Sequence, residues 1–212
     1  MIHVLAFDSS AAHCAAALLS DDSCTSRIEP MPTGQAERLL PLLEEMLAAA
    51  GLRWGDLAAL GTGTGPGNFT GTRIAVAAAR GLALGLGIPA VGVTLFEALA
   101  LGRDCTAVAD ARRGMAYAQP FAGGRPAAPA VMVAQDAPLP FAPGAVMVGD
   151  LAATLAPRHG ARALPPLYPL PEAIARITRA RYRQAPARPA PLYLRPADAA
   201  PPRAGPPPIL PG

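Results

Sequence analysis

Residues 61–73 read GTGTGPGNFTGTR, a loop rich in glycine. It follows the apolar run 57–61, which predicts a buried strand, and it precedes a helix predicted over roughly residues 72–86. Glycines between a strand and a helix can let backbone amides cradle a phosphate at the start of the helix. The GK[ST] ending of a P-loop is absent, however, and a tight, closely packed turn explains the glycines more simply. The residues alone favour the structural turn.

Upstream of this stretch, the sequence predicts a strand over residues 3–8 (HVLAFD) and a second over 14–20, joined as a hairpin. Asp8 and Ser9 end the first strand, where an aspartate either organises a metal-bound phosphate or forms a turn with its own side chain. The turn is the simpler interpretation. The candidates for a vestigial phosphate loop are Asp8, Ser9, Gly65 and Gly67, and no cofactor is expected.

Two helices have unusual surfaces. The first is predicted over residues 35–50 with Gly51 as its stop, and Pro41 suggests a kink or a later start. Its apolar residues cover an arc of about 160°, wider than the ~100° stripe that a helix on one sheet needs. They are Leu39, Leu40, Leu42, Leu43, Met46, Leu47 and Ala50. The surplus suggests a second covering partner, with Leu42 and Met46 at one edge of the arc and Leu40 and Leu47 at the other. The alternative is that both edges are core of this chain.

The helix after the glycine loop carries Ala77, Gly81 and Gly85 at intervals of four residues. Each glycine weakens a helix by about 1 kcal/mol relative to alanine. Such a stripe is favoured where another backbone must come close.

After residue 102 the strand pattern restarts. Strands are predicted over 105–110, 115–121, 131–134 and 145–148, with a basic helix over 171–184. The whole pattern predicts an α/β fold of two related halves, residues 1–102 and 103–198, followed by a disordered Pro-rich tail over 199–212. Asp110, Arg112 and Arg113, together with Tyr117, could meet an anionic ligand, but a charged hairpin tip on the surface is commoner.

The composition excludes several kinds of chemistry. All 18 basic residues are Arg, so reactions that need a lysine amine have no candidate. His3, His13 and His159 are too scattered to form an HxxxH or HExxH metal site, and no metal is expected. There is no GxSxG elbow, and the three cysteines form no CxxC pair. The net charge of +3 gives little support to nucleic-acid binding by this chain alone. Without a predicted signal peptide or membrane helix, the expected location is the cytoplasm.

Several segments together resemble the TsaB (YeaZ) family. They are HVLAFDSS at the start, AERLLPLLEEML at 36–47, GTGPGNFTGTRIAVAAARGLALGLGIPAVGVTLFEALA at 63–100, DARRGMAYAQ at 110–119 and PLYLRPADA at 191–199. The resemblance runs in order over nearly the whole chain except the tail, and GPGNFTGTRI with the following helix is its most specific part.

The resemblance implies an actin-like (ASKHA, ribonuclease H-like) fold of two subdomains. It also implies a non-catalytic paralogue of TsaD, the subunit that transfers threonylcarbamoyl to the tRNA adenosine beside the anticodon. TsaD holds its metal through an HxxxH pair on the first helix, whereas TGQAERLLP, residues 33–41, has no histidine. The implied partners are a TsaD-like subunit in a heterodimer and a TsaE-like ATPase in a larger complex, with tRNA met only through the complex. A homodimer of the chain alone stays open.

The resemblance places the partner interface on the two helices of the N-terminal half. The candidate interface residues are Leu39, Leu40, Leu42, Leu43, Met46, Leu47, Ala77, Gly81 and Gly85. The alternatives are an actin-like ATPase, a glycoprotease-like peptidase, and a protein that binds RNA by itself. The missing metal ligands, lysine and triad weigh against both enzymes.

Overall fold

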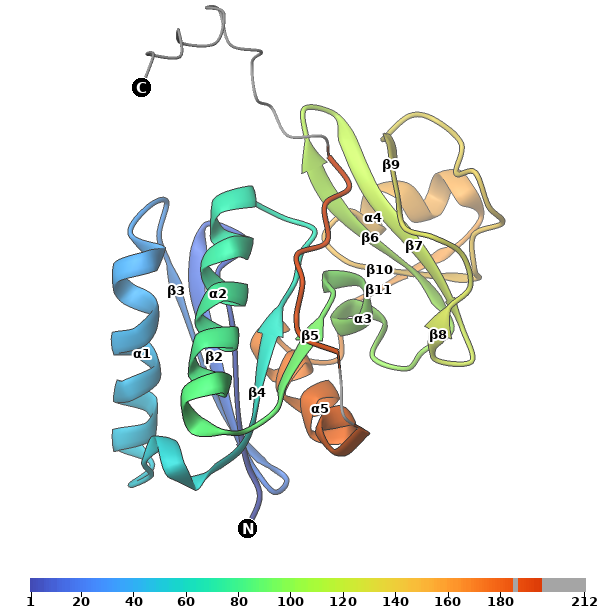
Figure 1. Ribbon diagram of the computed structural model, residues 1–212. Helices are drawn as coiled ribbons and strands as arrows, with labels where there is room; N and C mark the ends of the chain where they lie inside the picture. The colour runs from blue at the N-terminus through green and yellow to red at the C-terminus, as the bar shows by residue number, and fades with distance from the viewer. Residues whose placement is uncertain (185–186, 196–212) are drawn as a thin grey trace, which may run out of the picture.

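The computed structural model describes residues 1–184 and 187–195, which form two sheets with helices around them (Figure 1). The tail predicted from residue 199 onward lies outside the described residues. The first sheet has the strand order β3-β2-β1-β4-β5, and its strands are β1 (His3–Asp8), β2 (His13–Ser20), β3 (Ser23–Pro30), β4 (Leu57–Gly63) and β5 (Ala90–Val93). The second sheet has the order β11-β10-β6-β7-β8, with β9 also pairing β7. Its strands are β6 (Cys105–Arg112), β7 (Met115–Ala122), β8 (Arg125–Pro126), β9 (Val131–Ala134), β10 (Val146–Val148) and β11 (Arg162–Leu164).

The two sheets repeat one pairing plan. In the first, β1 pairs antiparallel with β2 and parallel with β4. In the second, β6 pairs antiparallel with β7 and parallel with β10. A hairpin followed by parallel strands in both halves confirms the predicted α/β fold of two related subdomains.

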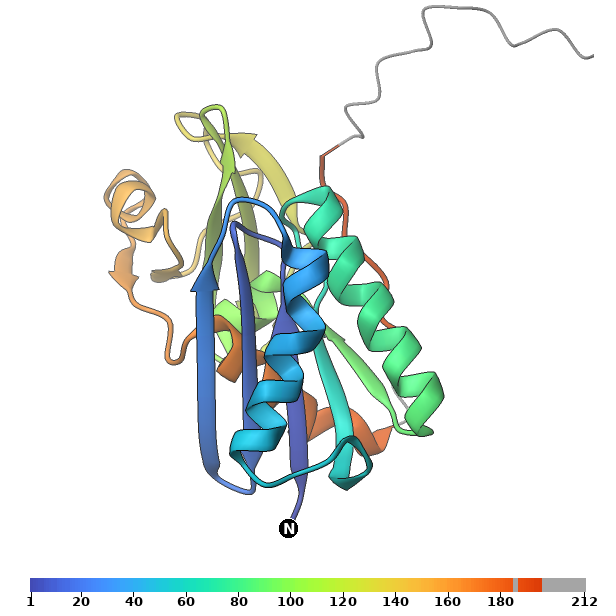
Figure 2. The ribbon, with the colours of Figure 1, turned by 90° about the vertical axis from the view of Figure 1, so that its left-hand side faces the viewer.

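Helices cover both faces of the first sheet. The helices α1 (Gln35–Ala49) and α2 (Phe69–Leu86) lie side by side on one face (Figure 2), and α5 (Leu170–Arg181) packs on the other. Because side chains alternate along a strand, Leu5 and Phe7 of β1 point to α1 and α2, while Val4 and Ala6 point to α5. A strand buried on both faces explains the unbroken apolar run HVLAF.

The second sheet is flanked by α3 (Leu95–Ala100) and by α4 (Ala152–Leu155) on opposite faces. Short 3-10 turns complete the chain, namely η1 (Trp54–Asp56), η2 (Ala156–His159) and η3 (Tyr182–Gln184). No helix of the described residues is long and apolar enough to cross a membrane.

The bounds and placement of three helices differ from the sequence-based expectation. The helix α1 begins at Gln35 and continues through Pro41, so neither a start at the proline nor a break there is needed. The helix α2 begins at Phe69 instead of residue 72, because Asn68 caps it. The predicted C-terminal half included residues 171–184, but α5 returns to the first sheet, where Ile174 and Ile177 complete the core.

Candidate functional site

The Asp8 carboxylate is held by its own loop. Its Oδ1 accepts hydrogen bonds from the backbone amide of Ser10 at 3.0 Å and from the Ser10 hydroxyl at 3.0 Å, and it lies 2.9 Å from Nε2 of His13. The residue is almost fully buried. The structure therefore gives Asp8 the turn-forming role, with one carboxylate oxygen bonded within the loop.

The glycines of the loop bring two backbones together. A Cβ at Gly71 would lie 1.8 Å from the carbonyl oxygen of Ser9, and one at Gly67 would lie 2.4 Å from that of Ser10. Across this contact the Ser9 hydroxyl donates to the Gly71 carbonyl at 2.8 Å. Close packing between the end of β1 and the start of α2 thus accounts for these glycines, as the structural interpretation predicted.

The first amides of α2 are already bonded. The Asn68 side chain accepts hydrogen bonds from the backbone amides of Thr70 at 2.9 Å and Gly71 at 3.3 Å. The backbone amide of Asn68 donates to the Ser10 carbonyl at 2.6 Å. The amide of Thr72 donates to the Asn68 carbonyl at 2.9 Å. A phosphate at a helix start needs such donors free. The candidate phosphate loop of Asp8, Ser9, Gly65 and Gly67 therefore lies in one place, but the amides of Thr70 and Gly71 beside it are already bonded. The preference of helices for Asn at the N-cap was the signal for this start in the sequence.

A cleft of about 430 Å³ separates the two subdomains above this loop. One wall carries Ser10 and Asn68, and the other carries Asp110 and Tyr117 from the β6–β7 hairpin, with Arg195 of the C-terminal segment beside them. The hairpin charges are largely paired among themselves. Arg112 lies 3.4 Å from the Asp110 carboxylate, and the Asp110 amide donates to Asp150 at 3.0 Å. The structure thus brings Asp110, Arg112 and Tyr117 to the wall of the cleft, whereas Arg113 is not part of its lining.

Histidine, cysteine and carboxylate side chains do not gather into a metal-binding group of three within residues 1–184 and 187–195. The three cysteines are free thiols, and burial raises the pKa of each. For Cys24 the pKa reaches about 11, mainly through desolvation and then through the charge of Glu172. These thiols are therefore protonated near neutral pH, and their electrostatics give no support to a nucleophile.

The outer surface of α1 is less apolar than predicted. Five of the candidate interface residues are buried core, namely Leu39, Leu42, Leu43, Met46 and Leu47. They pack against β1 and β2 on one side and against α2 on the other. The wide apolar arc is therefore covered from two sides within this chain, and these five residues are removed from the candidate interface. Among the leucines of the arc, Leu40 alone is exposed, at 43%.

The charges of α1 that face β3 are satisfied internally. Arg38 binds Glu29 and Glu45 at 2.6 Å each, and Arg27 joins the same network. The hydrogen bonds from Arg38 lower the pKa of Glu45 to about 2. This network closes the flank of α1 that faces β3.

The outer face of α2 is exposed, as predicted for Ala77, Gly81 and Gly85. A Cβ built at Gly81 or at Gly85 would meet no atom within 4 Å. Between them Leu84 is 82% exposed, which is unusual for a leucine in the middle of a folded chain. Nothing in the described part of the chain therefore requires these two glycines.

One feature of this face was missed from the sequence. Phe69 at the start of α2 and Tyr193 of the C-terminal segment are both about two-fifths exposed or more, with ring centroids 4.8 Å apart. The Arg73 guanidinium lies 3.7 Å from the centroid of the Phe69 ring and donates to the Tyr193 hydroxyl at 2.9 Å. The two aromatic residues are separated by more than a hundred positions, so no local pattern could join them.

Comparisons with known proteins agree with this architecture. Residues 33–125 match the family model described as TsaD, tRNA N6-adenosine threonylcarbamoyltransferase. YeaZ from Pseudomonas aeruginosa is 29% identical, with a TM-score of 0.69 over 92% of this chain and 100% of its own. A second structure, described as an uncharacterized protein with similarity to peptidase YEAZ from Pseudomonas aeruginosa, is 27% identical, with a TM-score of 0.73 over the same shares. No curated protein matches the chain.

Two subdomains of one pairing plan, facing each other across a cleft, define the actin-like (ASKHA) class of protein. Within that class, the chain spans the whole of both Pseudomonas structures and shares its central helices with the TsaD family model. The chain is a TsaB/YeaZ-like protein.

Proposed function

We propose that this chain is the non-catalytic subunit of a threonylcarbamoyladenosine synthesis complex, and that it binds a TsaD-like catalytic subunit through the outer face of α2 and Leu40 of α1. The observation that carries the proposal is the empty space over Gly81 and Gly85 beside the exposed Leu84. Two glycines inside a helix cost about 1 kcal/mol each. Close approach by a helix from outside the chain would explain glycine at both positions.

The match to the TsaD family model supports the choice of partner. It covers residues 33–125, which include α1 and α2 entirely. A TsaD-like subunit would therefore present a related pair of helices, and related surfaces pack naturally about a two-fold axis. A TsaE-like ATPase and tRNA would join through the complex. In the cell this chain would act in the cytoplasm beside its partner.

The composition of the surface also suits a protein interface. Its centre carries the small residues and the exposed Leu84, and one end carries the Phe69–Arg73–Tyr193 cluster. Aromatic residues and arginine are enriched among the residues that dominate binding energy at interfaces. The absence of histidine from residues 33–41, where TsaD would hold its metal, supports the non-catalytic role. The bonded amides at the start of α2 weigh against an actin-like ATPase, and no observation favours a peptidase.

The test is the double variant Leu40→Glu, Leu84→Glu, measured for affinity to the purified TsaD-like subunit and for melting temperature. Both residues are exposed, so the variant should stay folded. Two carboxylates buried without partners at the interface should weaken binding by roughly 100-fold or more. Leu167→Glu is the matched control, because Leu167 is 55% exposed and lies outside both helices. A double variant that binds as tightly as the wild type would refute the proposed surface.

A further inference from the structure

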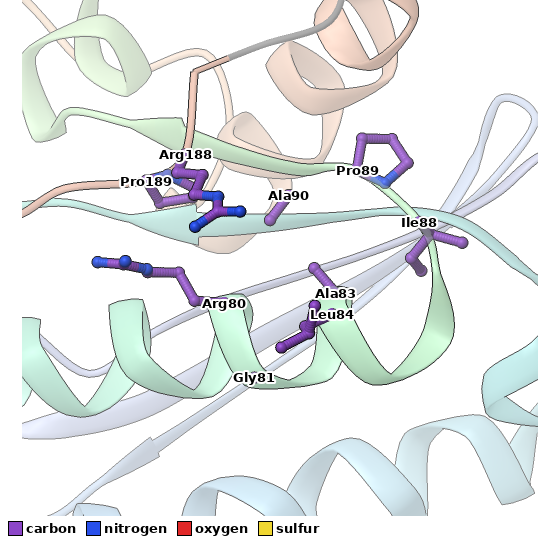
Figure 3. Close-up of a pocket in the computed structure, with 9 residues that line it drawn as sticks. All are labelled: Arg80, Gly81, Ala83, Leu84, Ile88, Pro89, Ala90, Arg188 and Pro189. Atoms are coloured by element: carbon purple, nitrogen blue, oxygen red, sulfur yellow. The ribbon is translucent and has the colours of Figure 1, made fainter.

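A groove runs beside the outer face of α2, between the C-terminal half of that helix and the segment at residues 188–189 (Figure 3). Its volume is about 430 Å³, within the range of pockets that hold small ligands or a few side chains. The lining is apolar along Leu84, Ile88, Pro89 and Ala90. The groove continues directly into the proposed partner surface, because Gly81 belongs to both.

Two arginines lie at one end of this groove. Arg80 comes from α2 and Arg188 from the C-terminal segment, and both side chains line the groove (Figure 3). Neither forms an ion pair or a side-chain hydrogen bond with any residue that the structure describes. Other arginines of the chain do have acidic partners, such as Arg181 with Glu97 at 2.6 Å.

The groove therefore carries two positive charges in its lining. Like charges that lie close repel each other, and they repel less when an anion lies between them. Arginine suits a carboxylate in particular, because its planar guanidinium can donate two parallel hydrogen bonds. Apolar side chains next to these arginines suit a carboxylate on a carbon chain better than a fully hydrated inorganic anion.

We propose that this groove binds an acidic, amphipathic segment of the protein partner. The carboxylate of a Glu or Asp would lie between Arg80 and Arg188, and an apolar residue one helical turn away would pack on Leu84 and Ile88. The inference rests on the proposed function, since the segment would belong to the TsaD-like subunit. It adds what the apolar surface alone cannot supply, namely a charge that selects the partner and fixes its register.

The test is the charge-reversal variant Arg80→Glu, Arg188→Glu, with Arg125→Glu, Arg162→Glu as the control of equal net charge. Arg125 and Arg162 are exposed on the second subdomain, away from both helices. Affinity for the TsaD-like subunit is measured at 50 mM and 300 mM salt. We expect the groove variant to bind at least tenfold more weakly at low salt and to lose most of the salt dependence, while the control keeps both. Acid-to-Arg changes on the first two helices of the partner should include one that restores binding to the groove variant.

The other possible results distinguish a failure of the inference from a failure of the proposed function. If the groove variant binds like the wild type while Leu40→Glu, Leu84→Glu does not, the inference is wrong and the proposed function stands. If the wild-type chain does not bind the TsaD-like subunit, both are wrong. Binding of tRNA by the chain alone that only the groove variant loses would assign the arginines to phosphate and overturn the inference. Tighter partner binding by a chain shortened after Arg195 would do the same, by giving the groove to the chain's own C-terminal residues.

Discussion

Gly71 and Gly81 lie ten residues apart in α2, and they are glycine for different reasons. At Gly71 there is no room for a side chain, since its Cβ would lie 1.8 Å from a backbone oxygen of the neighbouring loop. At Gly81 there is open space in this chain. The difference separates a glycine required by the fold from one required by something outside it.

We therefore expect opposite effects from two alanine substitutions. Gly71→Ala should destabilise the isolated chain by several kcal/mol, because backbone must move to relieve the clash. Gly81→Ala should stabilise it by up to about 1 kcal/mol, because alanine is the better helix former. The same Gly81→Ala change should weaken binding to the TsaD-like subunit. Chemical denaturation and a binding assay on both variants check this, and a stabilised Gly81→Ala chain with unchanged affinity would count against a close helix contact at that position.

At the scale of single residues, the sequence predicted the structural role of the glycine loop and the turn at Asp8. The Phe69–Arg73–Tyr193 cluster and the Arg80–Arg188 pair could not be predicted. Each joins α2 to a segment more than a hundred residues later, and contacts of that kind depend on the folded path of the chain.

Among the helices, α1 shows which part of the packing the helical periodicity of a sequence can predict. The sequence predicted an apolar arc of about 160° that needs two covering surfaces. In the structure two surfaces cover it. Periodicity gives the width of the arc but not the identity of its covers. The second cover is α2 of the same chain, with Ala75 and Ala79 against the leucines of α1. Small residues thus occupy both faces of α2: Ala75 and Ala79 lie in the core with α1, and Ala77, Gly81 and Gly85 are exposed.

Because α1 has buried and exposed leucines, we expect their substitutions to change the free energy of unfolding by very different amounts. Leu43→Ala should cost about 2–5 kcal/mol of unfolding free energy, because Leu43 is fully buried and its removal leaves a cavity. Leu40→Ala should change stability by less than about 0.5 kcal/mol, because that side chain is largely in solvent. Urea titrations of the two variants measure the difference. Equal losses would mean that Leu40 packs inside the chain and has no place in the interface.

The strand β3 was missed for a related reason. Its sequence, SCTSRIEP, is polar, and it lies at the edge of the first sheet with most of its side chains exposed. Edge strands often carry charges that discourage pairing with other chains, and those charges hide the strand from a hydrophobic pattern. Arg27 and Glu29 of β3 form the network with α1, so they also anchor the first helix.

In the whole molecule, the C-terminal residues of the chain pack against the first sheet, which the N-terminal residues form. After the second sheet, α5 packs beneath β1, β2 and β4, and the segment 187–195 then runs along β5 toward the cleft (Figure 1). The Leu192 amide donates to the Thr64 carbonyl at 2.8 Å, which fixes this segment against the glycine loop. A boundary drawn at residue 102 from the sequence separates the two sheets, but it could not show that the last helix belongs with the first.

This return has a functional consequence. It places Arg188 and Tyr193 beside α2, so that one face of the molecule combines the small-residue helix, the aromatic cluster and the groove. The cleft between the subdomains lies elsewhere, lined by a different set of residues. The proposed partner surface and the cleft between the subdomains are therefore separate places that can be told apart by experiment.

Amide hydrogen exchange of the chain, alone and with the TsaD-like subunit, shows whether the outer face of α2 is the partner surface. We predict that the partner slows exchange in residues 77–88 of α2 and the loop after it, and at residues 187–190, while β7 (Met115–Ala122) on the second subdomain exchanges at the same rate in both samples. Protection confined to the cleft, around residues 109–117, with no change along α2, would contradict the account.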